Sequence, residues 1–365
     1  MLAVSNYHYI REDFTSPFPS IFGLTPLQFK MQLEELSKHG SFISQNELLN
    51  FIEKPFDKNY ILITFDDGLA EQFELARPIL NEMGIPYICF INTENYVDKK
   101  VSLVHQIHMV RSQLSSETIV QNIQNKFSVE LTKEEKVKAI SNYSYDESSV
   151  AYLKYLLNFK LSFSQQKEII NVLFNQLYNE KEIVQKLYLN DEMLQIMYKE
   201  DALGSHSHSH IPLGIYTEKE IDIEFYQTQK FFLDKFGKKT KAISYPYGSK
   251  EACNNVEKIV KKNNFELGFS MERAATKSLK KNPFMIARYD CNDMPMGKSD
   301  IFVGVDNLFK IWVIKTFVLI AIGTLATWAL TVERSNNPDL VSLRGIPYVV
   351  PVILVLLVGA TFVLS

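Results

Sequence analysis

The stretch that decides the fold is NYILITFDDG, residues 59–68, whose first six residues are mostly apolar or β-branched and predict a buried parallel strand. Asp66 and Asp67 follow where that strand is expected to end, and Gly68 permits a sharp turn. In barrels of alternating strands and helices, the carboxyl ends of the strands carry the chemistry. Successive side chains point to opposite sides of an extended segment, so the two aspartates are expected to serve different partners. An isolated pair of this kind is more often an acidic turn cap, so the rest of the chain has to decide between the two interpretations.

Strand-like and helix-like segments alternate on both sides of this stretch. A helix is expected from Thr25-Pro26 to Gly40, and a second one begins at the capping box Ser44–Glu47. The helix after the paired aspartates, residues 69–83, is expected to kink or restart at Pro78. This order predicts an α/β fold with a parallel sheet and right-handed crossovers. The other strands are expected at residues 2–9, 86–92, 201–205, 242–245, 267–270 and 284–289, and further helices at residues 218–236 and 250–262.

Residues 101–198 have a different character and predict a helical insertion, either a lid or a sub-domain. Apolar residues recur there at helical intervals, and neither Gly nor Pro occurs between Pro86 and Gly204, so long helices are unobstructed. His105 and His108 lie three residues apart in this segment. We expect a core or surface role for them rather than a metal site.

Composition limits the class of protein. The 365 residues carry a formal charge of −3, with a pI near 6.2, which gives no reason to expect a nucleic-acid partner. Three widely spaced cysteines favour a reducing compartment over a disulfide framework. The first residues lack a secretory signal, so a cytoplasmic catalytic domain is expected.

The last part of the chain, residues 301–365, contains two apolar runs joined by the short polar stretch at residues 333–345. Residues 312–332 and 346–364 are each long enough to cross a bilayer and predict a transmembrane hairpin that would tether the domain to a membrane. The stretch RSNNPDLVSLRGIPYVVPVILVLLVG within this tail resembles a fragment of a sugar ABC-transporter permease. Two such helices alone could not transport a substrate, so the tail is interpreted as a gene fusion, a truncated reading frame or an assembly artefact.

A histidine cluster, His206-Ser207-His208-Ser209-His210, follows another predicted strand. Imidazole and carboxylate together suit Zn²⁺, Co²⁺, Ni²⁺ or Fe²⁺ rather than Ca²⁺ or Mg²⁺. A turn in this segment could bring His206 and His210 to one point near the aspartate pair, and two histidines with one aspartate would leave open positions for catalysis. A polar loop without function is the alternative for the cluster taken alone.

These residues carry a resemblance to the polysaccharide deacetylases (the NodB-homology domain, carbohydrate esterase family 4) over residues 1–300. Residues 64–68 match the first motif of that family, TFDDG, and residues 206–210 fit its second, histidine-rich motif. Residues 244–248 look like the third motif, RxPYG, with Ser244 in place of the usual arginine. The resemblance implies an irregular (β/α)7 barrel.

The same resemblance implies a role for each site residue. Asp66 would be the catalytic base, and the metal ligands would be Asp67, His206 and His210. One wall of the substrate groove would be formed by Pro246, Tyr247 and Gly248. Arg288 and Asp290 would sit at the substrate site, where the fourth motif has the groups that orient the base; a structural ion pair is the alternative for them.

The late histidine that serves as general acid in the family is absent, because no histidine follows His210. His8 is the first candidate to replace it, and a buried core histidine is the alternative. The sequence therefore predicts a metal-dependent hydrolase, most simply with Zn²⁺, that removes acetyl groups from N- or O-acetylated sugars or polysaccharides. Alternatives are a non-catalytic sugar-binding or membrane-tethered scaffold domain, a transport component, and another metallohydrolase or an iron oxygenase.

Overall fold

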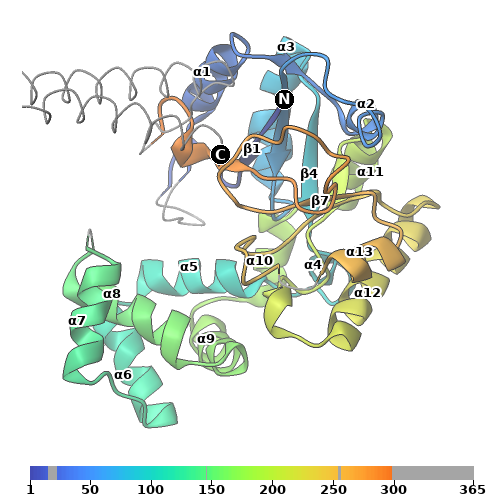
Figure 1. Cartoon of the computed structure of the whole chain (residues 1–365). Coiled ribbons are helices and arrows are strands. Elements are labelled where there is room, and N and C mark those ends of the chain that lie inside the picture. Colours follow the sequence, from blue (N-terminus) through green and yellow to red (C-terminus); the bar gives the residue numbers. More distant parts are fainter. Residues whose placement is uncertain (15–22, 145, 254–255, 298–365) are drawn as a thin grey trace, which may run out of the picture. The chain divides into compact units, whose positions relative to one another are not determined.

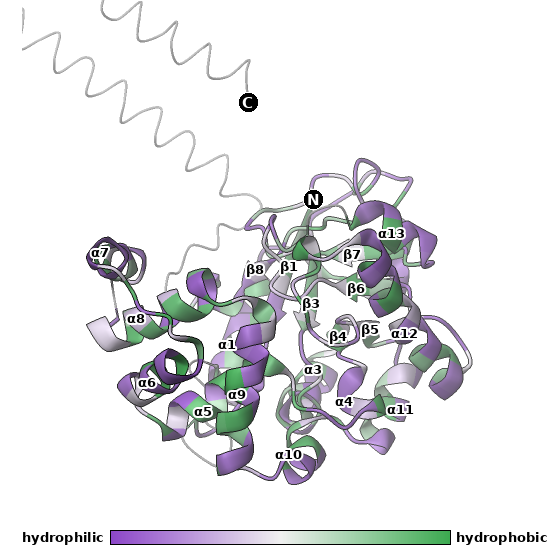
Figure 2. Ribbon diagram, turned by 90° about the horizontal axis from the view of Figure 1, so that it is seen from below, coloured by the Kyte–Doolittle hydropathy of each residue, from purple (hydrophilic) through white to green (hydrophobic). Residues whose placement is uncertain are grey.

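The computed structural model describes residues 1–14, 23–144, 146–253 and 256–297, which all fall within one compact unit, Met1–Phe302. A parallel sheet lies at its centre, and helices pack around the sheet (Figures 1 and 2). The α/β fold predicted from the sequence is confirmed. The strands are β1 (Leu2–Tyr7), β2 (Ser41–Phe42), β3 (Tyr60–Phe65), β4 (Tyr87–Ile91), β5 (Leu203–Ser205), β6 (Ala242–Ser244), β7 (Leu267–Phe269) and β8 (Tyr289–Asp290).

The strands are ordered β7-β6-β5-β4-β3-β1-β8, with β2 paired to β3, and every pairing between them is parallel. A bridge between Phe269 and Ile286 also links the chain before β8 to β7, so the two ends of the row approach each other. This arrangement fits a (β/α) barrel. All carboxyl ends meet at one rim, so residues after β1, β3, β5, β6 and β8 share it.

The helices beside the sheet begin largely where the sequence predicts. Thr25 and Ser44 form capping boxes with the residues three positions on. The segment Gln72–Ala76 is a π-helix that passes into α3 with Pro78 in its first turn, where the missing N–H of proline is harmless. These helices are α1 (Pro26–Leu36), α2 (Gln45–Leu49), α3 (Arg77–Met83), α4 (Glu94–Val97), α11 (Asp191–Lys199), α12 (Glu218–Phe236) and α13 (Glu257–Lys262).

Several expected boundaries are wrong in extent. α13 begins at Glu257 rather than at residue 250, and β8 has two residues where residues 284–289 were expected. α1 ends at Leu36, before Gly40 is reached. Local patterns set the type of these elements, whereas packing and hydrogen bonding set where they stop.

The segment between β4 and β5 is helical, as predicted, but its helices are short. The longest, α9, has 15 residues. Capping side chains start new helices without any Gly or Pro, as Ser115, Thr132 and Ser162 do by accepting backbone N–H groups. Long helices therefore do not form, although neither Gly nor Pro obstructs them. The helices are α5 (Leu103–Gln113), α6 (Ser116–Phe127), α7 (Lys133–Asn142), α8 (Ser148–Tyr155), α9 (Phe163–Leu177) and α10 (Glu180–Leu187), with a π-helix at Leu156–Lys160.

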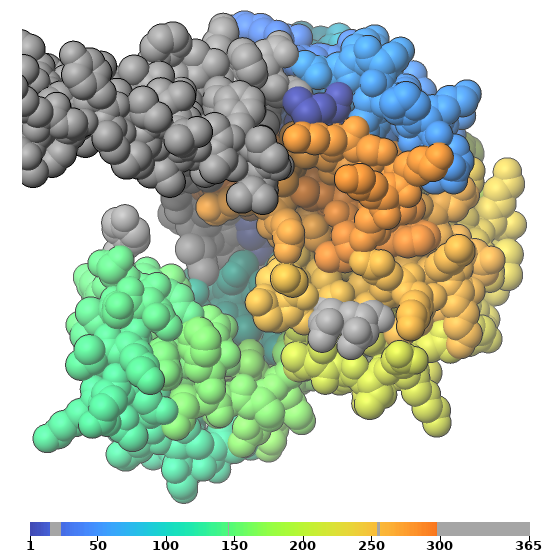
Figure 3. Space-filling view, in the orientation of Figure 1, coloured from blue at the N-terminus to red at the C-terminus, as the bar shows by residue number. Residues whose placement is uncertain are grey.

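We call residues 101–189 the helical region. Figure 3 shows most of it as a green lobe with a recess between it and the orange segment. Its apolar core includes Ile123, Ile170 and Phe174, and the same cluster takes in Tyr9 and Leu69 from the strand rim. The helical region is therefore packed against the carboxyl ends of β1 and β3.

The predicted transmembrane hairpin, residues 312–332 and 346–364, lies outside the described residues. Within residues 1–297, as far as the structure describes them, no helix combines the length and apolarity that a membrane span requires.

Candidate metal centre

The chain turns sharply after β3 and aims the two aspartates in different directions. Asp67 and Gly68 both have positive φ, 77° and 65°. A Cβ on Gly68 would lie 2.8 Å from Cγ2 of Ile91. Both the positive φ and this close contact therefore require glycine at position 68. Strained backbone of this kind at Asp67 persists only where the surrounding structure holds it.

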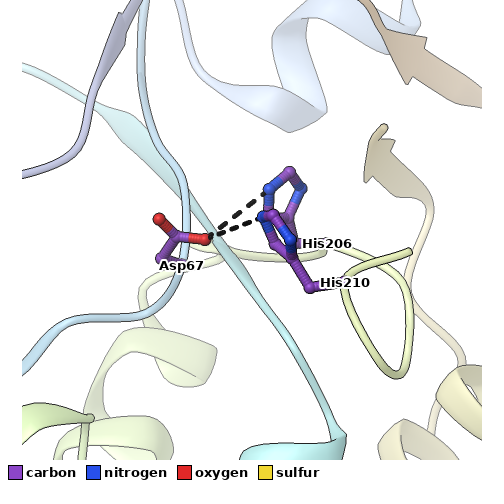
Figure 4. A group of neighbouring side chains, drawn as sticks. All are labelled: Asp67, His206 and His210. Carbon is purple, nitrogen blue, oxygen red and sulfur yellow. Dashed lines mark ion pairs between the residues drawn. The ribbon is translucent and has the colours of Figure 1, made fainter. Parts of the chain in front are cut away.

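Asp67, His206 and His210 converge as Figure 4 shows, with one ligand atom from each lying within 4.8 Å of the others. Oδ1 of Asp67 lies 3.4 Å from Nε2 of His210 and 3.7 Å from Nε2 of His206. All three side chains are buried, and Oδ1 has no hydrogen-bond partner among the described residues.

These residues fit a divalent ion. Metal–nitrogen and metal–oxygen bonds of about 2.0–2.2 Å separate neighbouring ligand atoms by roughly the spacings seen here. A buried carboxylate oxygen without a donor is also costly unless a cation or a proton donor meets it. Two imidazoles and one carboxylate suit Zn²⁺ and related ions, and three protein ligands leave a position open for a reactant.

Hydrogen bonds orient His206 toward this point. Its Nδ1 lies 2.8 Å from the carbonyl oxygen of Ser244, which can only accept, so Nδ1 carries the hydrogen and Nε2 is free as a ligand. Burial lowers the pKa of His210 to about 3 and outweighs the opposing charge of Asp67. His210 is therefore neutral at ordinary pH, as a ligand must be.

A buried glutamate holds the histidine loop in shape. Glu224 of α12 accepts hydrogen bonds from the backbone N–H groups of His208 and Ser209 and from the Ser209 hydroxyl. Nδ1 of the middle histidine, His208, lies 2.8 Å from the Thr93 hydroxyl, away from the metal group. His210 can thus keep its positive φ of 52°.

Asp66 has entirely different partners. Arg288 donates to both of its oxygens, at 2.9 Å and 2.8 Å, and Asn6 donates to Oδ2 at 3.1 Å. Burial alone would raise the pKa of Asp66, but Arg288, with His206 and His8, holds it well below its ordinary value. Asp66 is therefore ionised at neutral pH.

Arg288 also donates to the Ser244 hydroxyl at 2.8 Å. This chain has serine at position 244, where the family motif has arginine. The guanidinium of Arg288, from the other end of the row of strands, contacts that serine. Arg288 is fully buried, and its position suits the orienting of Asp66; the expected contact with substrate stays a prediction.

A cavity of about 460 Å³ opens over the two aspartates. The partly buried His8 lines it beside the carboxylates. Of the predicted PYG wall, Tyr247 lines the cavity, whereas Pro246 and Gly248 are buried beside it. The other lining residues are Asn6, Tyr9, Gly23, Asp66, Asp67, Val104, His108, His206, His210, Tyr245, Met271, Asp290, Cys291 and Asn292.

Sequence reasoning missed two contacts to the aspartates. Asn6, which binds Asp66, follows Ser5 in a strand whose other residues are apolar or aromatic, and that polar interruption was the available signal. His105 is buried, as expected of a core residue, but its Nε2 lies 3.3 Å from Oδ2 of Asp67. Its spacing from His108 gave no indication of that contact.

Comparison with known proteins gives the family. The polysaccharide deacetylase profile matches residues 53–145 and 165–268, more than half of the 365-residue chain, so the chain belongs to that family. No curated protein matches it.

Several solved structures are similar to the chain. IcaB from Ammonifex degensii is 14% identical, with 79% of this chain and 90% of that chain covered and a TM-score of 0.45. The deacetylase PplD from Streptococcus pyogenes, in complex with acetate, is 14% identical, with 82% and 96% covered and a TM-score of 0.45. The BpsB deacetylase domain from Bordetella bronchiseptica is 12% identical, with 79% and 95% covered and a TM-score of 0.43.

Proposed function

We propose that this member of the polysaccharide deacetylase family hydrolyses acetyl groups from N- or O-acetylated sugars, using a divalent metal held by Asp67, His206 and His210. The observation that carries the proposal is the division of the aspartate pair within one cavity. Asp66 is charged and pinned by Arg288, whereas Asp67 directs an unpaired oxygen at two histidines. A turn cap would need neither arrangement.

The bound ion, Zn²⁺ in the simplest case, would polarise the acetyl carbonyl and lower the pKa of a water. Asp66 would accept the proton of that water as its oxygen attacks the acetyl carbon. Oδ1 of Asp66 receives one hydrogen bond and Oδ2 receives two, so Oδ1 retains the lone pair for this step. The bond from the carbonyl carbon to nitrogen (or to oxygen, in an ester) then breaks, which releases acetate.

The leaving amine or alkoxide has to receive a proton. We assign this role to His8, because it lines the cavity with both aspartates and no histidine follows His210. Asp290 and Tyr247 also line this cavity, so they are the residues that we propose contact the sugar.

One observation favours a second candidate, a domain that binds acetylated sugar without cleaving it. Arg288 lowers the pKa of Asp66, and a carboxylate that releases its proton so readily is a weak base. The same cavity and metal group would serve such a domain. The division of the chain into a catalytic domain, residues 1–300, and a membrane-tethering tail stays a prediction, as does the cytoplasmic location.

The two candidates are separated by release of acetate from a panel of N-acetylated and O-acetylated glucosamine oligomers. The purified chain is stripped with a chelator and reloaded with Zn²⁺, Co²⁺, Ni²⁺ or Fe²⁺. We expect release only after metal is returned. Binding of the oligomers without any release would contradict hydrolysis and support the binding domain.

A further inference from the structure

The helical region is attached to the chain directly after the metal aspartate. Leu69 and Tyr188 form a bridge, and Leu189 donates its backbone N–H to the carbonyl oxygen of Gly68 at 3.0 Å. Leu69 and Tyr188 also share one apolar cluster. The residues that follow α10 therefore contact Gly68 and Leu69, the two residues after Asp67. This contact brings the helical region close enough to act on the Asp67 carboxylate.

A chain of buried polar contacts runs from the helical region to Asp67. The backbone N–H of Ser102 donates to the Tyr188 hydroxyl oxygen at 3.0 Å. The same hydroxyl lies 2.7 Å from Nδ1 of His105, whose Nε2 lies 3.3 Å from Oδ2 of Asp67. Each of these residues is at most 3% exposed.

The contacts favour one placement of the hydrogens. A backbone amide can only donate, so the Ser102 N–H occupies a lone pair of the Tyr188 oxygen. The hydroxyl hydrogen of Tyr188 then has Nδ1 of His105 as its acceptor. With Nδ1 accepting, the neutral ring carries its hydrogen on Nε2, which faces Asp67. The opposite tautomer would turn a nitrogen lone pair toward a carboxylate oxygen, which is repulsive.

We infer that His105 is a positioning residue for the metal centre: held by Tyr188, it donates from Nε2 to Oδ2 of Asp67 and leaves Oδ1 to the metal. The two oxygens of Asp67 are divided accordingly. Oδ2 lies 3.3 Å from Nε2 of His105, a buried nitrogen that has no aligned hydrogen-bond partner among the described residues and that a small turn of either side chain would bring into line with Oδ2. Oδ1 faces His206 and His210 without a donor of its own. A carboxylate with one oxygen engaged in this way is fixed in rotation and presents the other oxygen to the metal. This inference rests on the proposed metal site.

A matched pair of variants of the full chain tests this role. The amide nitrogen of His105→Gln can reach the place of Nε2, whereas the shorter His105→Asn reaches only that of Nδ1. Zinc affinity is measured by competition with a chromophoric chelator, without reference to turnover. We expect His105→Gln to retain most of the affinity and His105→Asn to bind zinc about 10–100-fold more weakly.

Two further variants complete the experiment. His108→Gln changes a histidine on the same helix that contacts Tyr9 rather than Asp67, and it should bind zinc like the wild type. Tyr188→Phe removes the hydroxyl that sets the tautomer, and it should weaken binding.

The inference is overturned if His105→Asn binds zinc as tightly as the wild type, if His105→Gln loses as much affinity as His105→Asn, or if Tyr188→Phe changes nothing. A wild-type chain that binds no zinc would overturn the metal site itself. That result is distinguishable, because it appears before any variant is made.

Discussion

The strand rim and the helical region approach the aspartate pair in different ways. On the rim, groups are fixed by backbone: Asp67, His210 and Tyr247 have positive φ, and Asp66 receives three hydrogen bonds from strand-end residues. The helical region reaches the pair through the side chain of His105, which lies at the end of a series of hydrogen bonds. In the proposed function, the rim would therefore define which atoms react, whereas the helical region would adjust how Asp67 is held.

Arg288→Ala is the most severe test of the rim. It leaves Asp66 buried without its charged partner, so we expect the free energy of unfolding to fall by about 3–5 kcal/mol and acetate release to be lost. Chemical denaturation and an acetate assay measure the two effects. The matched control is Ser244→Ala, which removes one acceptor of Arg288 and keeps the ion pair, and should cost only about 1–3 kcal/mol. Equal losses in both variants would contradict the importance of the Asp66–Arg288 pair.

His8→Gln tests whether the rim also supplies the acid. Loss of a general acid typically slows a reaction by about 10²–10⁴-fold. We expect a decrease of that order in acetate release, with the zinc content unchanged because His8 is not in the metal group. Unchanged turnover would contradict the assignment of His8 as the general acid and leave it as a residue of the cavity wall.

The smallest expected effect is a pH dependence of stability in the metal-free protein. Burial lowers the pKa of His210 to about 3, whereas an unfolded histidine titrates near 6.5. Below about pH 6.5 the unfolded chain therefore binds a proton that the folded chain does not bind. The free energy of unfolding should decrease as the pH is lowered. Asp66 and Asp67, whose pKa values are lowered in the fold, add to this loss only near and below their ordinary values.

The expected slope between pH 6.5 and pH 4.5 is about 1 kcal/mol per pH unit from His210, measured by urea unfolding with a chelator present. Burial also lowers the pKa of His108 to about 3, so His108 adds a similar slope and His210→Gln should remove about half of the dependence in this window. The same slope in both proteins would show that other groups carry the dependence. A smaller slope in His210→Gln would show that His210, a residue of the strand rim, lowers the stability of the folded protein at acidic pH.

Much of the rim was predictable because its residues follow apolar runs directly. A strand of a parallel sheet is read from local composition, and its carboxyl end fixes where the next side chains lie, as for Asp66 and His206. Arg288 was expected near the base, but its full burial was not, because burial depends on tertiary contacts of the chain before β8 with Asp66, Ser244 and Ser270.

The helical region was less predictable. Its helical character follows from periodicity. The breaks between its helices depend on caps such as Ser115 and Thr132, and composition alone did not indicate that these residues would end one helix and begin the next. The contact of His105 with Asp67 is tertiary: it depends on the packing of α5 and Tyr188 against Leu69. No local pattern in α5 distinguishes a histidine aimed at a carboxylate from one in the core.

The division of labour between the two aspartates is tested most directly by measuring zinc content and acetate release together for Asp66→Asn and Asp67→Asn. We predict that Asp66→Asn retains zinc and loses acetate release by about 100-fold or more. Asp67→Asn should lose both. Wild-type turnover in Asp66→Asn, or zinc retained by Asp67→Asn and lost by Asp66→Asn, would contradict the account.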